Sequence, residues 1–75
     1  MQAKATQKTL ERVQENISKA NALVTLAGIY SKKGLYAYAA NNFRRAESAY
    51  KEAGKYEDAY QCRLKWFVAE MYNCA

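Results

Sequence analysis

Few side chains in this chain of 75 residues have the chemistry of an enzyme active site. The sequence contains no histidine, the side chain that most readily exchanges protons near neutral pH. Glu57 and Asp58 are adjacent carboxylates, but neighbours on a helix point about 100° apart and cannot serve one substrate as an acid–base pair. Acidic side chains at the start of a predicted helix also interact favourably with its dipole. We therefore predict a non-enzyme without a cofactor.

The two cysteines, Cys62 and Cys74, have no histidine or further thiols to accompany them. Their spacing excludes the common zinc sites, provides no disulfide framework, and leaves neither thiol with a group to activate it. We predict free thiols, no bound metal and a reducing, cytoplasmic compartment.

No apolar stretch reaches the ~20 residues that a membrane-spanning helix needs, so we expect no membrane partner.

The net charge of +5 is concentrated in the first part of the chain. Residues 1–33 carry six basic and two acidic side chains, a net charge of +4, whereas residues 34–75 carry +1. Such a segment could bind nucleic acid or an acidic partner. A solvated lysine surface that maintains solubility explains the same charge without a partner.

Helices are the elements that must position any site. The chain has no proline and only three glycines, which favours long helices. Gly34 and Gly54 each follow a lysine-containing stretch and precede a new periodic stretch, as expected for glycine at the C-terminal end of a helix. We predict one all-α domain over 1–75, with short connections that force successive helices to pack antiparallel. The predicted helices cover residues 5–33, 36–53 and 56–73.

The first predicted helix carries an apolar stripe whose spacing of three and four residues is typical of a coiled coil. The apolar face widens from Leu23 onward, so we predict that the core lies within 22–74 and that 5–20 projects. A second copy of the chain could cover the projecting stripe, or the stripe could fold back on the third helix. The candidate dimerisation residues are Leu10, Val13, Ile17, Ala20 and Val24.

The second and third predicted helices begin with the same pattern, Gly-x-Tyr-x-x-Ala, at an offset of twenty residues. The predicted inner face of the second helix contains Tyr36, Ala39, Ala40, Phe43, Ala46, Tyr50 and Ala53. The predicted inner face of the third helix contains Tyr56, Ala59, Tyr60, Phe67, Met71 and Cys74, with Arg63 among them. A cation in such a position must extend to solvent, pair with a carboxylate or a ring, or bind a partner.

Aromatic residues are the strongest sign of protein recognition. The chain has seven tyrosines, two phenylalanines and one tryptophan. Tyrosine and tryptophan are enriched at interaction hot spots because they combine a large apolar area with a polar atom. Trp66 could instead cap the small core. The candidate partner-binding residues are Tyr38, Tyr56, Tyr60, Arg63, Trp66 and Tyr72.

Residues 23–56 resemble a tetratricopeptide or SNAP-like helical repeat. The small, aromatic and glycine positions of that pattern are filled by Ala27, Tyr30, Gly34, Tyr36, Ala39, Phe43 and Ala46. A second unit begins at Gly54. The resemblance implies an array of helical hairpins, although the closing proline is missing. Solenoid repeats usually need about three units, so we expect this array to complete its core by dimerising or by binding another protein.

The chain also resembles a family of small AraC negative regulators. The turn and first aromatic of that pattern are matched by Gly34, Tyr36, Ala39, Ala40, Phe43 and Ala46. Its last helix is loosely matched by Tyr60, Cys62, Arg63, Trp66 and Phe67. The resemblance implies a protein, often a helical dimer, that binds and inhibits an AraC-type transcription activator.

Two alternatives to a protein-binding module stay open. In the first, the chain is a small basic DNA- or RNA-binding protein, whose helix–turn–helix would use Lys32, Lys33, Asn41, Asn42, Arg44 and Arg45. Against this alternative, Asn41, Asn42 and Arg45 are predicted to face away from the inner face of the second helix, so a solvated outer face explains them without a nucleic acid. In the second, the chain is a fragment of a longer solenoid. We expect a non-enzymatic protein-recognition module, a homodimer, that regulates transcription by inhibition.

Overall fold

A computed structural model describes the backbone of residues 2–74 and the side chains of residues 9–74. The described residues form three α-helices and no strand, which confirms the predicted all-α fold. The helices are α1 (Gln2–Lys32), α2 (Tyr36–Glu52) and α3 (Tyr56–Cys74). The predicted boundaries agree with these within three residues at every end.

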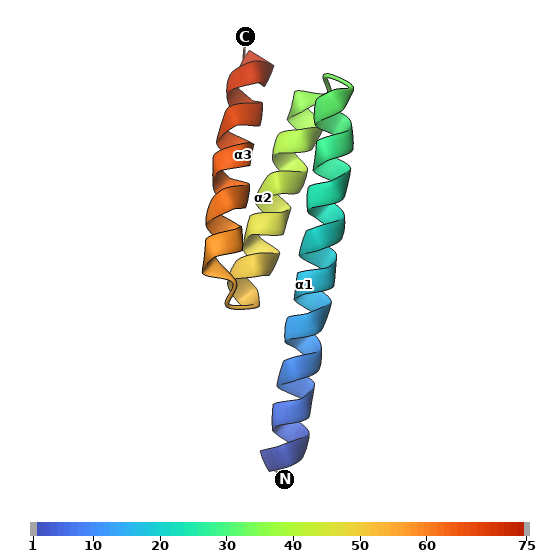
Figure 1. Cartoon of the computed structure of the whole chain (residues 1–75), viewed down its shortest axis with the longest axis vertical. Helices are drawn as coiled ribbons and strands as arrows, with labels where there is room; N and C mark the ends of the chain where they lie inside the picture. Colours follow the sequence, from blue (N-terminus) through green and yellow to red (C-terminus); the bar gives the residue numbers. More distant parts are fainter. Residues whose placement is uncertain (1, 75) are drawn as a thin grey trace.

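The three helices lie side by side in one layer, with α2 between α1 and α3 (Figure 1). Successive helices run antiparallel, and the Cα atoms extend over 54 × 18 × 12 Å. The helix α1 packs mainly on α2, and its stripe shares buried clusters with α3 residues at Ala20, Val24 and Ala27. The first part of α1 extends beyond the end of α2 (Figure 1), as predicted for a projecting segment.

Both interhelical turns are built around a glycine in the left-handed conformation. The φ angles of Gly34 and Gly54 are 78° and 76°. In the first turn, the Leu35 amide donates to the Tyr30 carbonyl at 2.9 Å, and the Gly34 amide donates to the Ser31 carbonyl at 3.0 Å. The second turn repeats both bonds twenty residues later, at 2.8 and 3.0 Å. The two turns are therefore Schellman motifs, as the glycine positions predicted.

Replacement by alanine should have opposite effects at a turn glycine, Gly54, and at a glycine inside a helix, Gly28. Gly54→Ala should lower the free energy of unfolding by about 1–2 kcal/mol, because an L side chain is strained at positive φ. Gly28→Ala should instead raise it by about 0.5–1 kcal/mol, because Gly28 lies inside α1 and an added Cβ meets nothing within 4 Å. Urea unfolding of both variants measures the difference, and a loss at Gly28 would contradict this assignment.

The buried residues form two clusters along the length of the layer. The cluster near the α2–α3 turn contains Ala20, Leu23, Ala46, Ala49, Tyr50, Ala59 and Cys62. The cluster near the α1–α2 turn contains Ala27, Ala39, Ala40, Phe43 and Ala69. Most of these side chains are alanine, so the helices approach closely and little large apolar surface is buried between them.

The predicted inner face of α2 is confirmed by its five buried members, Ala39, Ala40, Phe43, Ala46 and Tyr50. The hydroxyl of Tyr50 donates a hydrogen bond to the Oδ1 atom of Asn21 and thereby joins α2 to α1. The buried position of Asn42 was not expected, because we had placed it on the solvated outer face. Its Nδ2 atom donates to the Tyr38 carbonyl at 2.8 Å, which satisfies the amide inside the layer.

Two of the five proposed dimerisation residues belong to the core of the monomer. Ala20 is fully buried against α2, and Val24 packs against both core clusters. Their assignment to a dimer seam is therefore corrected. Leu10 is 57% exposed, whereas Val13 and Ile17 are half-buried. Among the stripe residues whose side chains are described, only Leu10 is exposed, and the side chains of residues 5–8 of the predicted segment lie outside the described residues.

Candidate functional site

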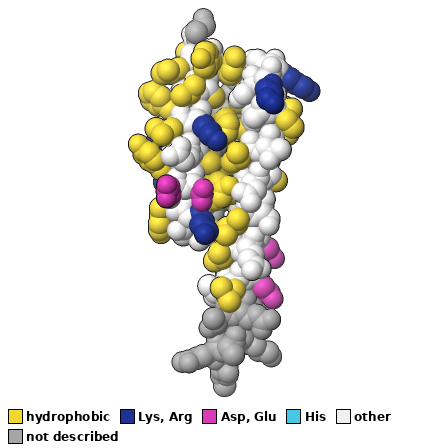
Figure 2. Space-filling model, viewed as in Figure 1, with side chains coloured by type: hydrophobic (Ala, Val, Ile, Leu, Met, Phe, Trp, Pro, Cys, Tyr) yellow, Lys and Arg dark blue, Asp and Glu magenta, His cyan; other side chains and the backbone are white. Residues whose placement is uncertain are grey.

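The most unusual feature of the molecule is the distribution of its large apolar side chains. Among the described residues, no large side chain is completely buried, and twelve large hydrophobic side chains are at least 40% exposed. Seven of these twelve lie on α3: Tyr56, Tyr60, Leu64, Phe67, Val68, Met71 and Tyr72. Figure 2 shows hydrophobic side chains along much of the length of α3. Exposed apolar surface of this kind marks an interaction site.

The helix α3 is apolar on two opposite sides. Its inner side packs on α2 through Ala59, Cys62, Trp66 and Ala69. Its outer side carries Tyr60, Leu64, Phe67 and Met71, which we call the outer stripe. Their spacing of four, three and four residues places them on one helical face. Because a helix that is apolar all round is normally buried on both sides, the outer stripe is a candidate binding surface.

The predicted inner face of the third helix is therefore wrong for most of its members. Tyr56, Tyr60, Phe67 and Met71 are between 55% and 70% exposed, and Cys74 is also exposed. Of the predicted inner residues, Ala59 is the one that the structure buries. The three fully packed inner residues, Ala59, Cys62 and Ala69, have small side chains that fit against the alanines of α2, whereas Trp66 is half-buried. Side-chain size, more than hydrophobicity, therefore selects the buried face.

An apolar groove of about 320 Å³ lies beside the outer stripe, where α3 meets the start of α2 and the end of α1. Its lining consists of Ser31, Tyr36, Phe43, Leu64, Lys65, Val68, Ala69 and Tyr72. The rings of Tyr36 and Tyr72 stack with their centroids 5.2 Å apart and form one wall. Lysine is the only charged residue type in this lining, and Lys32 and Lys33 are exposed next to Ser31. The groove thus combines apolar walls with a positive rim.

The six candidate partner-binding residues do not form one patch. Tyr56 and Tyr60 are exposed on α3, whereas Tyr72 lines the groove. Tyr38 is 60% exposed, and its ring lies 5.4 Å from that of Tyr30. Trp66 is half-buried and packs against the cluster that contains Phe43, so it caps the core as the alternative interpretation proposed.

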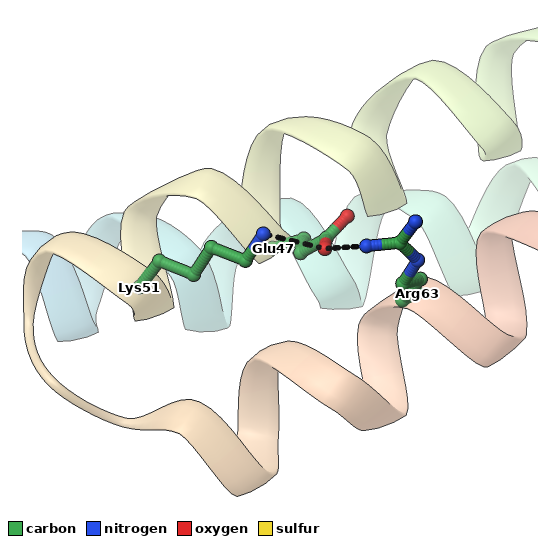
Figure 3. Close-up of polar contacts among 3 residues, drawn as sticks. All are labelled: Glu47, Lys51 and Arg63. Carbon is green, nitrogen blue, oxygen red and sulfur yellow. Dashed lines mark ion pairs between the residues drawn. The ribbon is translucent and has the colours of Figure 1, made fainter.

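The last of the six candidates, Arg63, pairs with a carboxylate. Its guanidinium lies 3.6 Å from Oε2 of the buried Glu47, and the Lys51 ammonium lies 3.3 Å from the same oxygen (Figure 3). The side chain of Arg63 is 61% exposed, so its predicted place inside the inner face of the third helix is wrong. The pair compensates the charge of Glu47, and most of the Arg63 side-chain surface stays open to a partner.

Both cysteines are free, as predicted, but their surroundings differ. Cys62 is buried between α2 and α3, whereas Cys74 is exposed. Burial is the main cause that raises the pKa of the Cys62 thiol above its ordinary value of 9.0, and it likewise raises the pKa of the Tyr50 hydroxyl above 10.0. The thiol of Cys62 is therefore neutral at physiological pH and is a core side chain, not a nucleophile.

The raised pKa values predict an alkaline loss of stability. The unfolded chain releases these protons near pH 9 and 10, whereas the folded chain retains them, so the unfolded state binds fewer protons. Stability should be complete below pH 9 and should fall as the pH rises through the higher pKa values of the folded state. Urea unfolding at pH 7 and about pH 10 measures the fall. Cys62→Ala should reduce the fall, whereas Cys74→Ala should leave it as in the wild type.

Other kinds of site find less support in the described residues. Within residues 9–74 no group of three or more histidine, cysteine or acidic side chains could hold a metal ion. Helices of the described part are too short or too polar to cross a bilayer. For a nucleic-acid site, Asn42 is the weakest candidate, because its buried amide is bonded within α2.

Leu64 and Val68 are, like Lys65, site residues that the sequence interpretation missed. Both are exposed on α3, and both line the groove. A signal was present in the spacing of Tyr60, Leu64, Phe67 and Met71, which alternates between four and three residues like the stripe in the first helix.

Comparison with protein-family models, curated proteins and solved structures finds no match to this chain.

Proposed function

We propose that this protein is a non-enzymatic protein-recognition module that binds a segment of another protein in the groove between α3, α2 and the end of α1. The apolar groove with its positive rim is the observation that carries the proposal. Apolar walls such as Phe43, Val68 and Tyr72 suit aliphatic or aromatic side chains. Lys65 and the neighbouring Lys32 and Lys33 favour acidic residues beside them. The preferred partner segment is therefore apolar and acidic.

The resemblance to AraC negative regulators suggests a more specific version of this proposal. In that version the partner is an AraC-type transcription activator, and binding inhibits it. The lysines near the groove, Lys65 in its lining and Lys32 and Lys33 next to Ser31 in the sequence, support an acidic partner without distinguishing a protein from a nucleic acid. Salt makes that distinction, because binding to DNA or RNA weakens steeply as salt rises, whereas binding that depends mainly on apolar contacts and on a few lysines weakens much less.

The experiment compares wild-type protein with a groove variant and a matched control at two salt concentrations. Bait proteins carry Lys65→Glu in the lining or Lys55→Glu at the exposed start of α3. We expect one protein partner that the wild type and Lys55→Glu retain at both salt concentrations and that Lys65→Glu loses. Direct titration of that partner, or of an AraC-type activator, then tests binding with purified components. Equal retention by all three baits, or recovery of nucleic acid alone, would overturn the proposal.

A further inference from the structure

The outer stripe of α3 has the spacing of a coiled-coil seam. Tyr60, Leu64, Phe67 and Met71 occupy alternating positions that correspond to d, a, d and a of a heptad. Their exposed fractions are 58%, 44%, 59% and 55%. All four are exposed, and Leu64 also borders the groove beside α2, so the fold leaves this seam without a covering helix.

The charged residues beside the outer stripe are arranged to pair with those of a second copy of α3 that runs in the opposite direction. Arg63 and Glu70 directly precede Leu64 and Met71, so both occupy the g position on one edge of the seam, seven residues apart. The opposite edge carries Gln61 and Val68, which are uncharged. The charged edge of one helix can therefore form complementary ion pairs only with the charged edge of a second copy of the same helix.

Like edges meet when two copies of α3 pack antiparallel. In that arrangement Leu64 faces Phe67 of the second copy, and Tyr60 faces Met71. Arg63 of each copy then lies near Glu70 of the other, so a two-fold axis generates two ion pairs. In a parallel pair, the charged edge of one helix meets the uncharged edge of the other, and neither Arg63 nor Glu70 gains an opposite charge.

We propose that the protein forms a two-fold symmetric homodimer through the outer stripe, with the two α3 helices antiparallel. The ion pair between Arg63 and Glu47 is compatible with this arrangement, because the guanidinium has five N–H donors and the Arg63 side chain is 61% exposed. The seam uses α3, and not the α1 stripe that the sequence suggested. The seam shares Leu64 with the groove lining, but Arg63 and Glu70 lie outside that lining, so substitutions at these two residues test the dimer separately from the proposed function.

The decisive experiment mixes two charge-reversal variants. Arg63→Glu and Glu70→Arg should each raise the dimer dissociation constant by about tenfold or more, because each homodimer brings like charges together twice. An equimolar mixture should restore dimerisation, since a heterodimer contains only opposite pairs. Sedimentation equilibrium over a range of concentrations measures all three samples, and thermal unfolding shows that each variant is folded. Arg45→Glu, an exposed change on α2, is the control and should dimerise like the wild type.

Cysteine cross-linking tests the orientation. The antiparallel arrangement places Glu57 near Cys74 of the second copy, because both continue the heptad of the outer stripe. Glu57→Cys should therefore give a disulfide between residues 57 and 74 of different copies under mild oxidation. A disulfide joining the two Cys74 residues of wild-type protein would overturn the antiparallel arrangement. A monomer at every concentration, or a mixture no more dimeric than either variant, would overturn the dimer and leave the groove proposal standing.

Discussion

Replacement of Phe43 by alanine should remove a large part of the stability of the protein. Phe43 is 6% exposed and is the largest side chain buried in the cluster near the α1–α2 turn. Truncation of a buried phenylalanine costs about 3–5 kcal/mol. A chain of this length is stabilised by roughly 4–11 kcal/mol, at about 0.05–0.15 kcal/mol per residue. Urea unfolding followed by far-UV circular dichroism measures the loss.

Phe67→Ala is the matched control for this prediction. The same substitution on α3 changes a side chain that is 59% exposed. In a dilute sample, where a dimer is dissociated, it should cost less than about 1 kcal/mol. In a concentrated sample it should also weaken dimerisation. Equal losses for Phe43→Ala and Phe67→Ala in dilute solution would mean that Phe67 faces the core after all.

Enlargement of a buried alanine should have the second-largest effect. Ala46 is fully buried in the cluster that joins α1, α2 and α3, where the helices approach closely. Ala46→Leu should destabilise the protein by about 1–3 kcal/mol, because the added carbon atoms must separate the helices or adopt strained rotamers. Leucine is a good helix former, so helix propensity does not account for such a loss.

The control for Ala46→Leu is Ala37→Leu, which changes an exposed alanine on the same helix. We expect its effect on the free energy of unfolding to be within about 0.5 kcal/mol. Thermal unfolding of both variants gives the comparison. A stabilised Ala46→Leu variant would show that the contact between α1 and α2 contains unfilled space, and would contradict the close packing described above.

The sequence determined the local structure almost completely. Without proline, and with glycine at positions 34 and 54, the chain can form long helices that end where a left-handed residue is needed. The twenty-residue offset between the two glycines reappears as two turns with the same hydrogen bonds. The inner face of α2 was also predictable, because its apolar residues lie on a single side while the opposite side is polar.

Only the tertiary structure decided which side of α3 is buried. Apolar residues occur on both sides of that helix, so hydrophobicity cannot choose between Phe67 and Met71 on one side and Cys62 and Ala69 on the other. The choice depends on the surface of α2, where fully buried alanines allow close approach only to small side chains. Large side chains are consequently left outside. The same packing brought Arg63 to Glu47 and created the groove, since both depend on residues from separate helices.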